Sequence, residues 1–192
     1  ASSNGVVSDQ SGPETGYVSD GISEDIEWVI SSSELEASWN SFNDPLSGIK
    51  NYEYAVGDSP EGVNILSWTN IGLETQVLIQ GLPLSHGSQY YIGVRGIDSV
   101  DNIGPPSFSN GLTVDLVLPD VTGVIESETA GVEGLDLDYM NQADTIIISW
   151  SGQDALSGVE YFETSLGTIE GSDDIVSWKV IDNPNIFSDE LF

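Results

Sequence analysis

An internal duplication limits the fold of this chain more than any other feature of its sequence. Segments of the first half return in the second half at an offset of about 110 residues. The matched pairs are Ser38-Trp39 with Ser149-Trp150, Leu46–Ile49 with Leu156–Val159, Tyr52-Glu53 with Phe162-Glu163, and Ser67-Trp68 with Ser177-Trp178. A repeat of this length has the size of one domain. The sequence therefore predicts tandem copies of one module.

The limits of the two copies define the predicted domain organisation. Residues 17–119 are predicted to form one complete module, and residues 120–192 a second copy that lacks its last two strands. Residues 1–16 are interpreted as the tail of a preceding module or as a linker, because Ser3–Val6 resembles Ser109–Leu112. We therefore expect the parent polypeptide to contain a longer array of such modules.

Hydrophobic residues inside the complete copy alternate with a period of two, which is typical of β-strands. Clusters of Gly, Pro, Asn, Asp and Ser separate the alternating runs and predict turns. The runs are Leu35/Ala37/Trp39, Tyr52/Tyr54/Val56, Val77/Ile79, Tyr90/Ile92/Val94 and Leu112/Val114/Leu116. About seven short strands in roughly 100 residues predict an all-β fold, an antiparallel sandwich of two sheets.

The chain is strongly acidic, with 3 Lys+Arg against 32 Asp+Glu and a formal net charge of −29. Three basic residues cannot neutralise a row of phosphates, so nucleic-acid binding is excluded. No apolar run reaches the roughly 20 residues that a membrane span needs, so we expect no membrane insertion. Because cysteine is absent, disulfides and thiol chemistry are excluded as well.

Several of these residues together resemble a fibronectin type III module. Trp39, the Gly48-Ile49 turn, the Tyr52–Val56 strand and the Leu84–Tyr90 segment carry the resemblance. It implies immunoglobulin-like sandwiches in tandem, the second incomplete, and a corner tyrosine whose hydroxyl bonds to upstream backbone. The local sequence motifs are also similar to those of modules in tandem arrays of large exported bacterial surface proteins. The residues expected in structural roles are Trp39, Tyr52, Tyr90, Trp150 and Phe162.

The sequence predicts no enzyme. His86 is the only histidine and lies in an expected turn beside Ser85 and Ser88. A Ser–His–Asp triad needs an oriented base and an oxyanion hole, and nothing in the sequence marks either. No Gly-x-Ser-x-Gly elbow, phosphate loop or dinucleotide fingerprint occurs. The sequence around His86 therefore favours a solvated loop over a catalytic site.

Acidic residues in three groups are candidate calcium ligands, although no cofactor is required by the sequence. Hard divalent cations bind clusters of oxygen ligands. The groups are Asp25 with Glu27 on an expected strand, their repeat Asp136 with Asp138, and the loop residues Asp98, Asp101 and Asn102. The alternative is a plain solvated acidic surface, since 32 acidic residues form clusters by chance.

Two tryptophans are candidate sugar platforms. Trp68 and Trp178 occupy equal positions in the two copies, each after a serine on a short expected strand. A flat ring can stack on the face of a sugar, but aromatic side chains also cover sheet margins. Both interpretations stay open at this point.

We expect a non-catalytic spacer or adhesion segment of a long extracellular or cell-surface protein. Its partners would be neighbouring modules of the same polypeptide, cell-surface proteins or glycans. The alternative is an accessory region of a secreted polysaccharide-degrading enzyme that holds the catalytic domain near its substrate.

Overall fold

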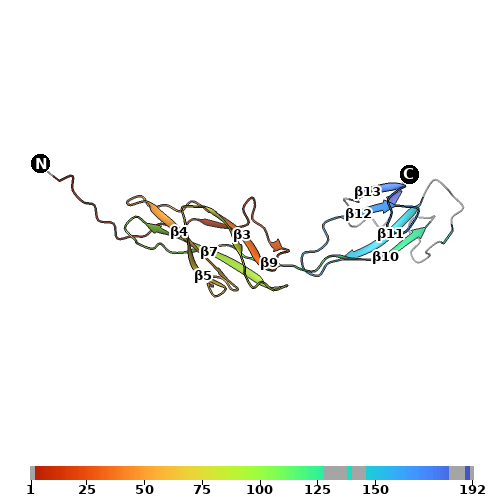
Figure 1. The fold of residues 1–192 in the computed structure, drawn as a ribbon, viewed down its shortest axis with the longest axis horizontal. Helices are drawn as coiled ribbons and strands as arrows, with labels where there is room; N and C mark the ends of the chain where they lie inside the picture. The colour runs from red at the N-terminus through yellow and green to blue at the C-terminus, as the bar shows by residue number, and fades with distance from the viewer. Residues whose placement is uncertain (1–2, 128–137, 140–145, 182–188, 191–192) are drawn as a thin grey trace. The chain divides into compact units, whose positions relative to one another are not determined.

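The computed structural model describes residues 3–127, 138–139, 146–181 and 189–190 of the chain. These residues form strands, turns and loops without a helix, which confirms the predicted all-β class. The part of the chain described therefore holds no helix that could cross a membrane. Contacts divide the chain into unit 1, Ala1–Leu116, and unit 2, Val117–Phe192, which are considered separately (Figure 1).

Unit 1 is a sandwich of two β-sheets (Figure 1). One sheet has the strand order β1-β3-β6, and the other has the order β2-β9-β7-β4-β5 with β8 on β7. All pairs are antiparallel except β2 with β9. The strands are β1 (Tyr17–Asp20), β2 (Trp28–Val29), β3 (Glu34–Asn40), β4 (Ile49–Gly57), β5 (Leu66–Gly72), β6 (Gln76–Gln80), β7 (Gln89–Asp98), β8 (Ser107–Phe108) and β9 (Leu112–Val114).

The alternation of the sequence places one face of each strand in the core. Every second residue from Leu35 to Trp39 in β3 and from Tyr90 to Val94 in β7 is buried. The inner faces of the two sheets meet in one hydrophobic cluster, which also includes Val56 and Leu112. The predicted strands and their core faces are thereby confirmed for these runs.

The same aromatic pair lies in the core of each unit. In unit 1, Trp39 meets Tyr52 edge to face with ring centroids 5.9 Å apart and planes at 70°. In unit 2, Trp150 meets Phe162 at 5.9 Å and 65°. Edge-to-face contacts of this kind stabilise aromatic pairs beyond simple burial. All four rings are buried, as the structural role expected of them requires.

Tyr90 forms the predicted corner of unit 1. Its ring is buried, and its hydroxyl accepts a hydrogen bond from the backbone N–H of Ser85 at 3.0 Å. The contact ties the start of β7 to the turn before it. This confirms the corner that the family resemblance implied.

Two local expectations were wrong. Asp25 and Glu27 do not lie on a strand, because β2 begins only at Trp28. The last strand, β9, ends at Val114, and Leu116 is exposed rather than buried. Strand β2 begins later, and strand β9 ends earlier, than the alternation of the side chains indicates.

The residues before β1 pack on unit 1. We call residues 9–16 the leading segment. Within it, Pro13 is fully buried, and Glu14 forms a backbone bridge with Asn43. A side chain at Gly12 would collide with the backbone of Ile103, so glycine permits this close approach. Descent of these residues from a preceding module stays a prediction, as do the exact module limits.

The described residues of unit 2 form five strands in two sheets of the orders β10-β11-β14 and β12-β13. They are β10 (Asp120–Ser127), β11 (Ile147–Gln153), β12 (Phe162–Leu166), β13 (Val176–Ile181) and β14 (Asp189–Glu190). Its buried cluster is small and consists of Ile148, Trp150 and Phe162 with a few half-buried neighbours. Among the strands described, β12 pairs only with β13, whereas the matching β4 of unit 1 also pairs with β7.

Candidate metal centre

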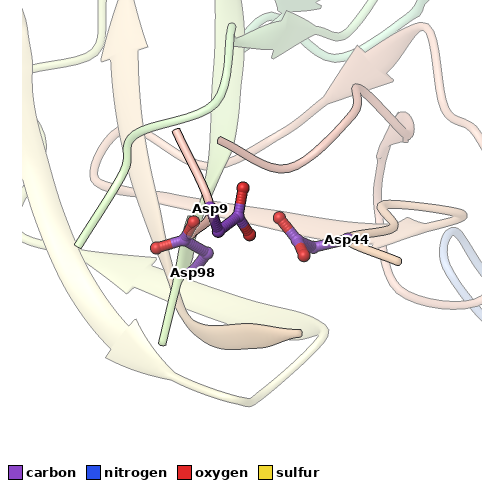
Figure 2. Close-up of side chains that lie close together, drawn as sticks. All are labelled: Asp9, Asp44 and Asp98. Atoms are coloured by element: carbon purple, nitrogen blue, oxygen red, sulfur yellow. The ribbon is translucent and has the colours of Figure 1, made fainter. Parts of the chain in front are cut away.

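Three aspartates from separate parts of unit 1 come together at one place, and we call them the aspartate cluster. Asp9 belongs to the leading segment, Asp44 to the loop between β3 and β4, and Asp98 ends β7. Each offers an oxygen within 4.8 Å of those offered by the other two. Figure 2 shows the three side chains gathered from their three segments. No second group of this kind occurs among the residues that the structure describes.

Asp44 is held by the turn that follows it. Its Oδ1 accepts hydrogen bonds from the backbone N–H groups of Leu46, Ser47 and Gly48 at 3.0, 2.8 and 3.0 Å. Gly48 has a φ of +72°, a left-handed conformation that glycine adopts without strain. The turn therefore fixes one oxygen of Asp44 and leaves the other for a further contact.

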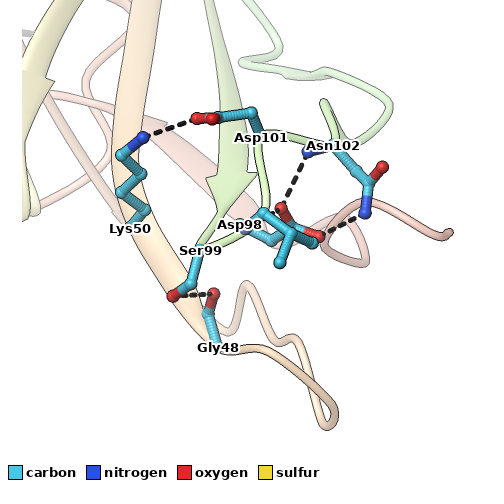
Figure 3. Close-up of polar contacts among 7 residues, drawn as sticks. Gly48, Lys50, Asp98, Ser99, Asp101 and Asn102 are labelled. Carbon is cyan, nitrogen blue, oxygen red and sulfur yellow. Dashed lines mark hydrogen bonds and ion pairs between the residues drawn. The ribbon is translucent and has the colours of Figure 1, made fainter. Parts of the chain in front are cut away.

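Asp98 is fully buried at the end of β7. Its Oδ1 accepts hydrogen bonds from the backbone N–H groups of Val100 at 2.9 Å and Asn102 at 2.7 Å. Its Oδ2 accepts one from the side-chain amide of Asn102 at 2.7 Å (Figure 3). Burial raises the pKa of Asp98, but the hydrogen bonds from Asn102 and Val100 outweigh it, so the net pKa is lowered.

Asp9 reaches the cluster from the leading segment. Its Oδ1 accepts hydrogen bonds from the N–H and hydroxyl of Ser11, both at 3.1 Å. Asn102 also donates from its side chain to the backbone oxygens of Asp9 at 3.4 Å and Ser11 at 3.3 Å. Hydrogen bonds, led by that from the Ser11 backbone, lower the pKa of Asp9. The Asp9 and Asp98 carboxylates are therefore ionised at neutral pH.

The predicted calcium loop is only partly brought together. Asp98 lies in the aspartate cluster, and Asn102 supports it as a hydrogen-bond donor. Asp101 has a φ of +70° and instead bonds to the ammonium of Lys50 at 2.5 Å (Figure 3). Asp9 and Asp44 thus take the places beside Asp98 that the sequence assigned to its loop neighbours.

The other predicted metal ligands that the structure describes are not gathered. Asp25 and Glu27 are exposed, and Oδ1 of Asp25 accepts a hydrogen bond from the backbone N–H of Asp20 at 2.9 Å. Asp138 is exposed, and Asp136 lies outside the described residues. Calcium binding at these two pairs stays a prediction without support from the geometry.

Trp68 is part of a packed stack on the outer face of unit 1. The guanidinium of Arg95 lies 4.3 Å from the centroid of its ring, and the ring of Phe108 lies 6.4 Å away. Nε and Nη2 of Arg95 in turn both donate to Oε2 of Glu53, at 2.9 and 2.6 Å. Cation–π and ion-pair contacts of this kind favour the interpretation that Trp68 covers the sheet.

Trp178 occupies the matching position in unit 2 but lies 61% exposed. It lines an apolar groove of unit 2 together with Val121, Val124 and Tyr161. A ring with this exposure remains accessible for stacking on a ligand, unlike Trp68.

The contacts of His86 differ from those of the histidine in a catalytic triad. Its Nδ1 accepts a hydrogen bond from the backbone N–H of Leu116 at 3.1 Å and lies 3.4 Å from Oδ1 of Asp115. An Nδ1 that accepts places the proton of the neutral ring on Nε2. In a triad the carboxylate binds a protonated Nδ1, and Nε2 is the free base. His86 therefore holds the end of the module instead.

Sequence reasoning missed Asp9 and Asp44. Asp44 carried a usable signal, because the turn from Asp44 to Gly48 returns as Asp154 to Gly158, with hydrogen bonds at 3.0 Å from Leu156 and Gly158 to Asp154. Asp9 carried none, since it lies outside the repeated strands and its neighbours in space are 35 and 89 residues away. A pattern of nearby residues cannot reveal such a contact.

Comparison with known proteins gives fold neighbours only. No protein-family model and no curated protein matches the sequence. Among solved structures, the FN1–FN3 domains of chicken CNTN1 match at 15% identity and a TM-score of 0.45, over 94% of this chain and 57% of that one. The kinase region of twitchin from C. elegans (Fn31-NL-kin-CRD-Ig26) matches at 20% identity and a TM-score of 0.40, over 55% of this chain and 17% of that one.

The assignment of the fold rests on the chain's own geometry. Unit 1 divides its strands between a β1-β3-β6 sheet and a sheet centred on β9-β7-β4-β5. The Tyr90 corner joins β7 to the preceding turn, and the buried pair of Trp39 and Tyr52 returns in unit 2. The chain is therefore built from fibronectin type III-like β-sandwich modules.

Proposed function

We propose that this chain is a spacer and adhesion segment of a longer extracellular or cell-surface protein. The observation that carries the proposal is the path of the chain through unit 1. The leading segment meets the module at Asp98, the last residue of β7. The chain leaves beside Gln89, the first residue of β7, which pairs with Thr113. Ten residues at about 3.3 Å each separate these two ends by about 30 Å.

A module whose chain enters at one end and leaves at the other extends an array by its full length. A pulling force then acts along the strands and is first resisted where the chain enters and leaves, by the pairing of β1 with β3 and of β9 with β7 and β2. The two sheets of unit 1 share one buried hydrophobic cluster, so unit 1 can bear load without contacts from a neighbouring module. The charge of −29 adds solubility and suits a saline exterior, where salt screens self-repulsion.

Force spectroscopy on the full chain tests the mechanical part of the proposal. Unit 1 should unfold in a single step, with a gain in contour length of roughly 300 Å or more for about 100 residues. Val56→Ala, which opens a cavity in the buried core, should lower the unfolding force. Gradual extension without a step would refute a load-bearing role. Antibody against unit 1 should label intact cells, and labelling only after permeabilisation would refute exposure at the surface.

Contact with glycans is a second candidate function, favoured by the exposed ring of Trp178. It would suit an accessory region of a polysaccharide-degrading enzyme. In a pull-down with insoluble polysaccharides, Trp178→Ala should abolish binding of the full chain. Tyr17→Ala removes another exposed ring, at 76%, and should leave binding unchanged. Absence of binding by the unaltered chain would remove this candidate and leave the spacer role untouched.

A further inference from the structure

The aspartate cluster concentrates negative charge that no basic side chain of unit 1 offsets. The whole sequence has three Lys and Arg residues. Lys50 bonds to Asp101 and Arg95 bonds to Glu53, both outside the cluster. The third, Lys179, belongs to β13 of unit 2. Like charges within 4.8 Å of one another repel strongly unless a cation lies between them.

One oxygen of the cluster is buried without a protein donor. Oδ2 of Asp9 is shielded from solvent and accepts no hydrogen bond, although Oδ1 of the same carboxylate is bonded to Ser11. Beside it, the side chain of Asp98 has no exposed surface. Buried carboxylate oxygens are ordinarily paired with a donor or coordinate a metal. The unpaired oxygen of Asp9 therefore points to a cation as its partner.

We propose that the aspartate cluster binds one calcium ion and that this ion fastens the leading segment to unit 1. Calcium binds oxygen at 2.3–2.6 Å. Two oxygens on the same ion are then at most about 5 Å apart, and the cluster meets this limit with its spread of 4.8 Å. The site shares Asp98 with the loop predicted from the sequence but takes its other ligands from Asp9 and Asp44.

The chemistry of the cluster favours calcium over other metals. Its ligands are carboxylate oxygens, whereas zinc and copper prefer nitrogen and sulfur. The hydroxyl of Ser47, in the turn that holds Asp44, is buried without a hydrogen-bond partner and offers a further oxygen. Magnesium demands near-ideal octahedral geometry at shorter distances, while calcium accepts irregular sites completed by water.

The position of the site gives the ion a mechanical role beyond the proposed spacer function. Asp9 lies ahead of the first strand, Asp44 lies in the loop between β3 and β4, and Asp98 ends β7, at the end of the sandwich where the chain enters. A shared ion links these three segments. Removal of the ion would leave the repulsion among the carboxylates unopposed, and the leading segment would separate from unit 1. The flexibility of the chain ahead of unit 1 thus depends on calcium.

Titration calorimetry on the full chain in about 0.5 M NaCl, which screens diffuse binding to other acidic groups, tests the proposal. We expect one calcium site in the range of extracellular modules, with a Kd of about 10⁻⁴ to 10⁻³ M, and weaker binding of magnesium. Asp9→Asn should weaken calcium binding at least tenfold. Asp101→Asn removes the same charge from a neighbouring exposed residue and should leave the Kd within about twofold.

Hydrogen exchange supplies a readout of the mechanical role. Calcium should slow exchange of the amides of residues 9–16 in the unaltered chain and in Asp101→Asn, but not in Asp9→Asn. An Asp9→Asn chain that melts in chelator as the unaltered chain does establishes that the variant is folded. The proposal is overturned if calcium up to about 10 mM, above the weakest range for such modules, gives no binding at this site. Equal weakening by the two variants, or equal binding of magnesium, would also overturn it.

Discussion

Asp20 gives unit 1 a dependence on pH that can be worked out from its surroundings. It ends β1 with no exposed surface. Its Oδ2 accepts a hydrogen bond from the N–H of Gly111 at 3.0 Å, while Oδ1 is buried without a partner. Desolvation, with a smaller contribution from the charge of Asp25, raises its pKa from 3.8 to about 6, against the opposing hydrogen bonds from Ser109 and Gly111.

The sign of the effect follows from proton linkage. The folded state holds the Asp20 proton more tightly than the unfolded state does, so the contribution to stability is complete below pH 3.8 and is lost as pH rises through about 6. One unit of pKa corresponds to about 1.4 kcal/mol, so the full loss would be roughly 3 kcal/mol. We expect a loss of about 1–3 kcal/mol.

The variant Asp20→Asn isolates this contribution. The amide keeps an oxygen for the N–H of Gly111 and cannot ionise. In urea denaturation followed by tryptophan fluorescence, the free energy of unfolding of the variant minus that of the unaltered chain should rise by about 1–3 kcal/mol between pH 4 and pH 7. The subtraction cancels the titration of the other acidic residues. Asp58→Asn, at an exposed residue, should give a flat difference. A flat difference for Asp20→Asn as well would refute the reasoning.

Three further perturbations test the packing and the charge. Tyr90→Phe removes the hydrogen bond from Ser85 and should lower the free energy of unfolding by about 1 kcal/mol, measured in urea. Trp68→Ala removes the ring under Arg95 and should lower the free energy of unfolding by about 1–3 kcal/mol. Trp178→Ala, at a largely exposed ring, should change it by no more than about 0.5 kcal/mol. Equal losses for the two variants would contradict the assigned difference in packing. Transfer from low salt with chelator to about 1 M NaCl, where the Debye length is about 3 Å, should raise the melting temperature by several degrees, and an unchanged curve would show that self-repulsion is unimportant.

The core could be predicted from the sequence because its information is local. In a strand, alternate residues face opposite sides of the sheet, so the run from Leu35 to Trp39 specifies both the strand and its buried face. The repeat then reveals which aromatics pair, since Trp39 and Tyr52 return as Trp150 and Phe162. Alternation fails at strand ends, where the backbone leaves the sheet. For that reason Asp25 and Leu116 were misplaced.

The candidate site could be predicted only in part, because its contacts join residues distant in sequence. Asp98 was identified from its loop, but its neighbour Asp101 adopts a positive φ and bonds to Lys50, 51 residues away. Asp9 enters through the packing of Pro13 on unit 1. Backbone conformation and tertiary packing decide both outcomes, and neither leaves a periodic trace in the sequence.

The repeated turn separates the structural role of Asp44 from its role in the proposed site. Asp154 accepts hydrogen bonds from Leu156 and Gly158 in unit 2, as Asp44 does from the matching amides in unit 1. Asp154 has no counterparts of Asp9 and Asp98 gathered around it among the residues that the structure describes. In unit 2 the turn holds the aspartate through Oδ1, and Oδ2 of Asp154 is buried without a hydrogen-bond partner. In unit 1 the same turn places the carboxylate of Asp44 beside those of Asp9 and Asp98. The aspartate that holds the turn therefore also becomes a ligand of the proposed site, because the leading segment and the end of β7 supply the other two carboxylates.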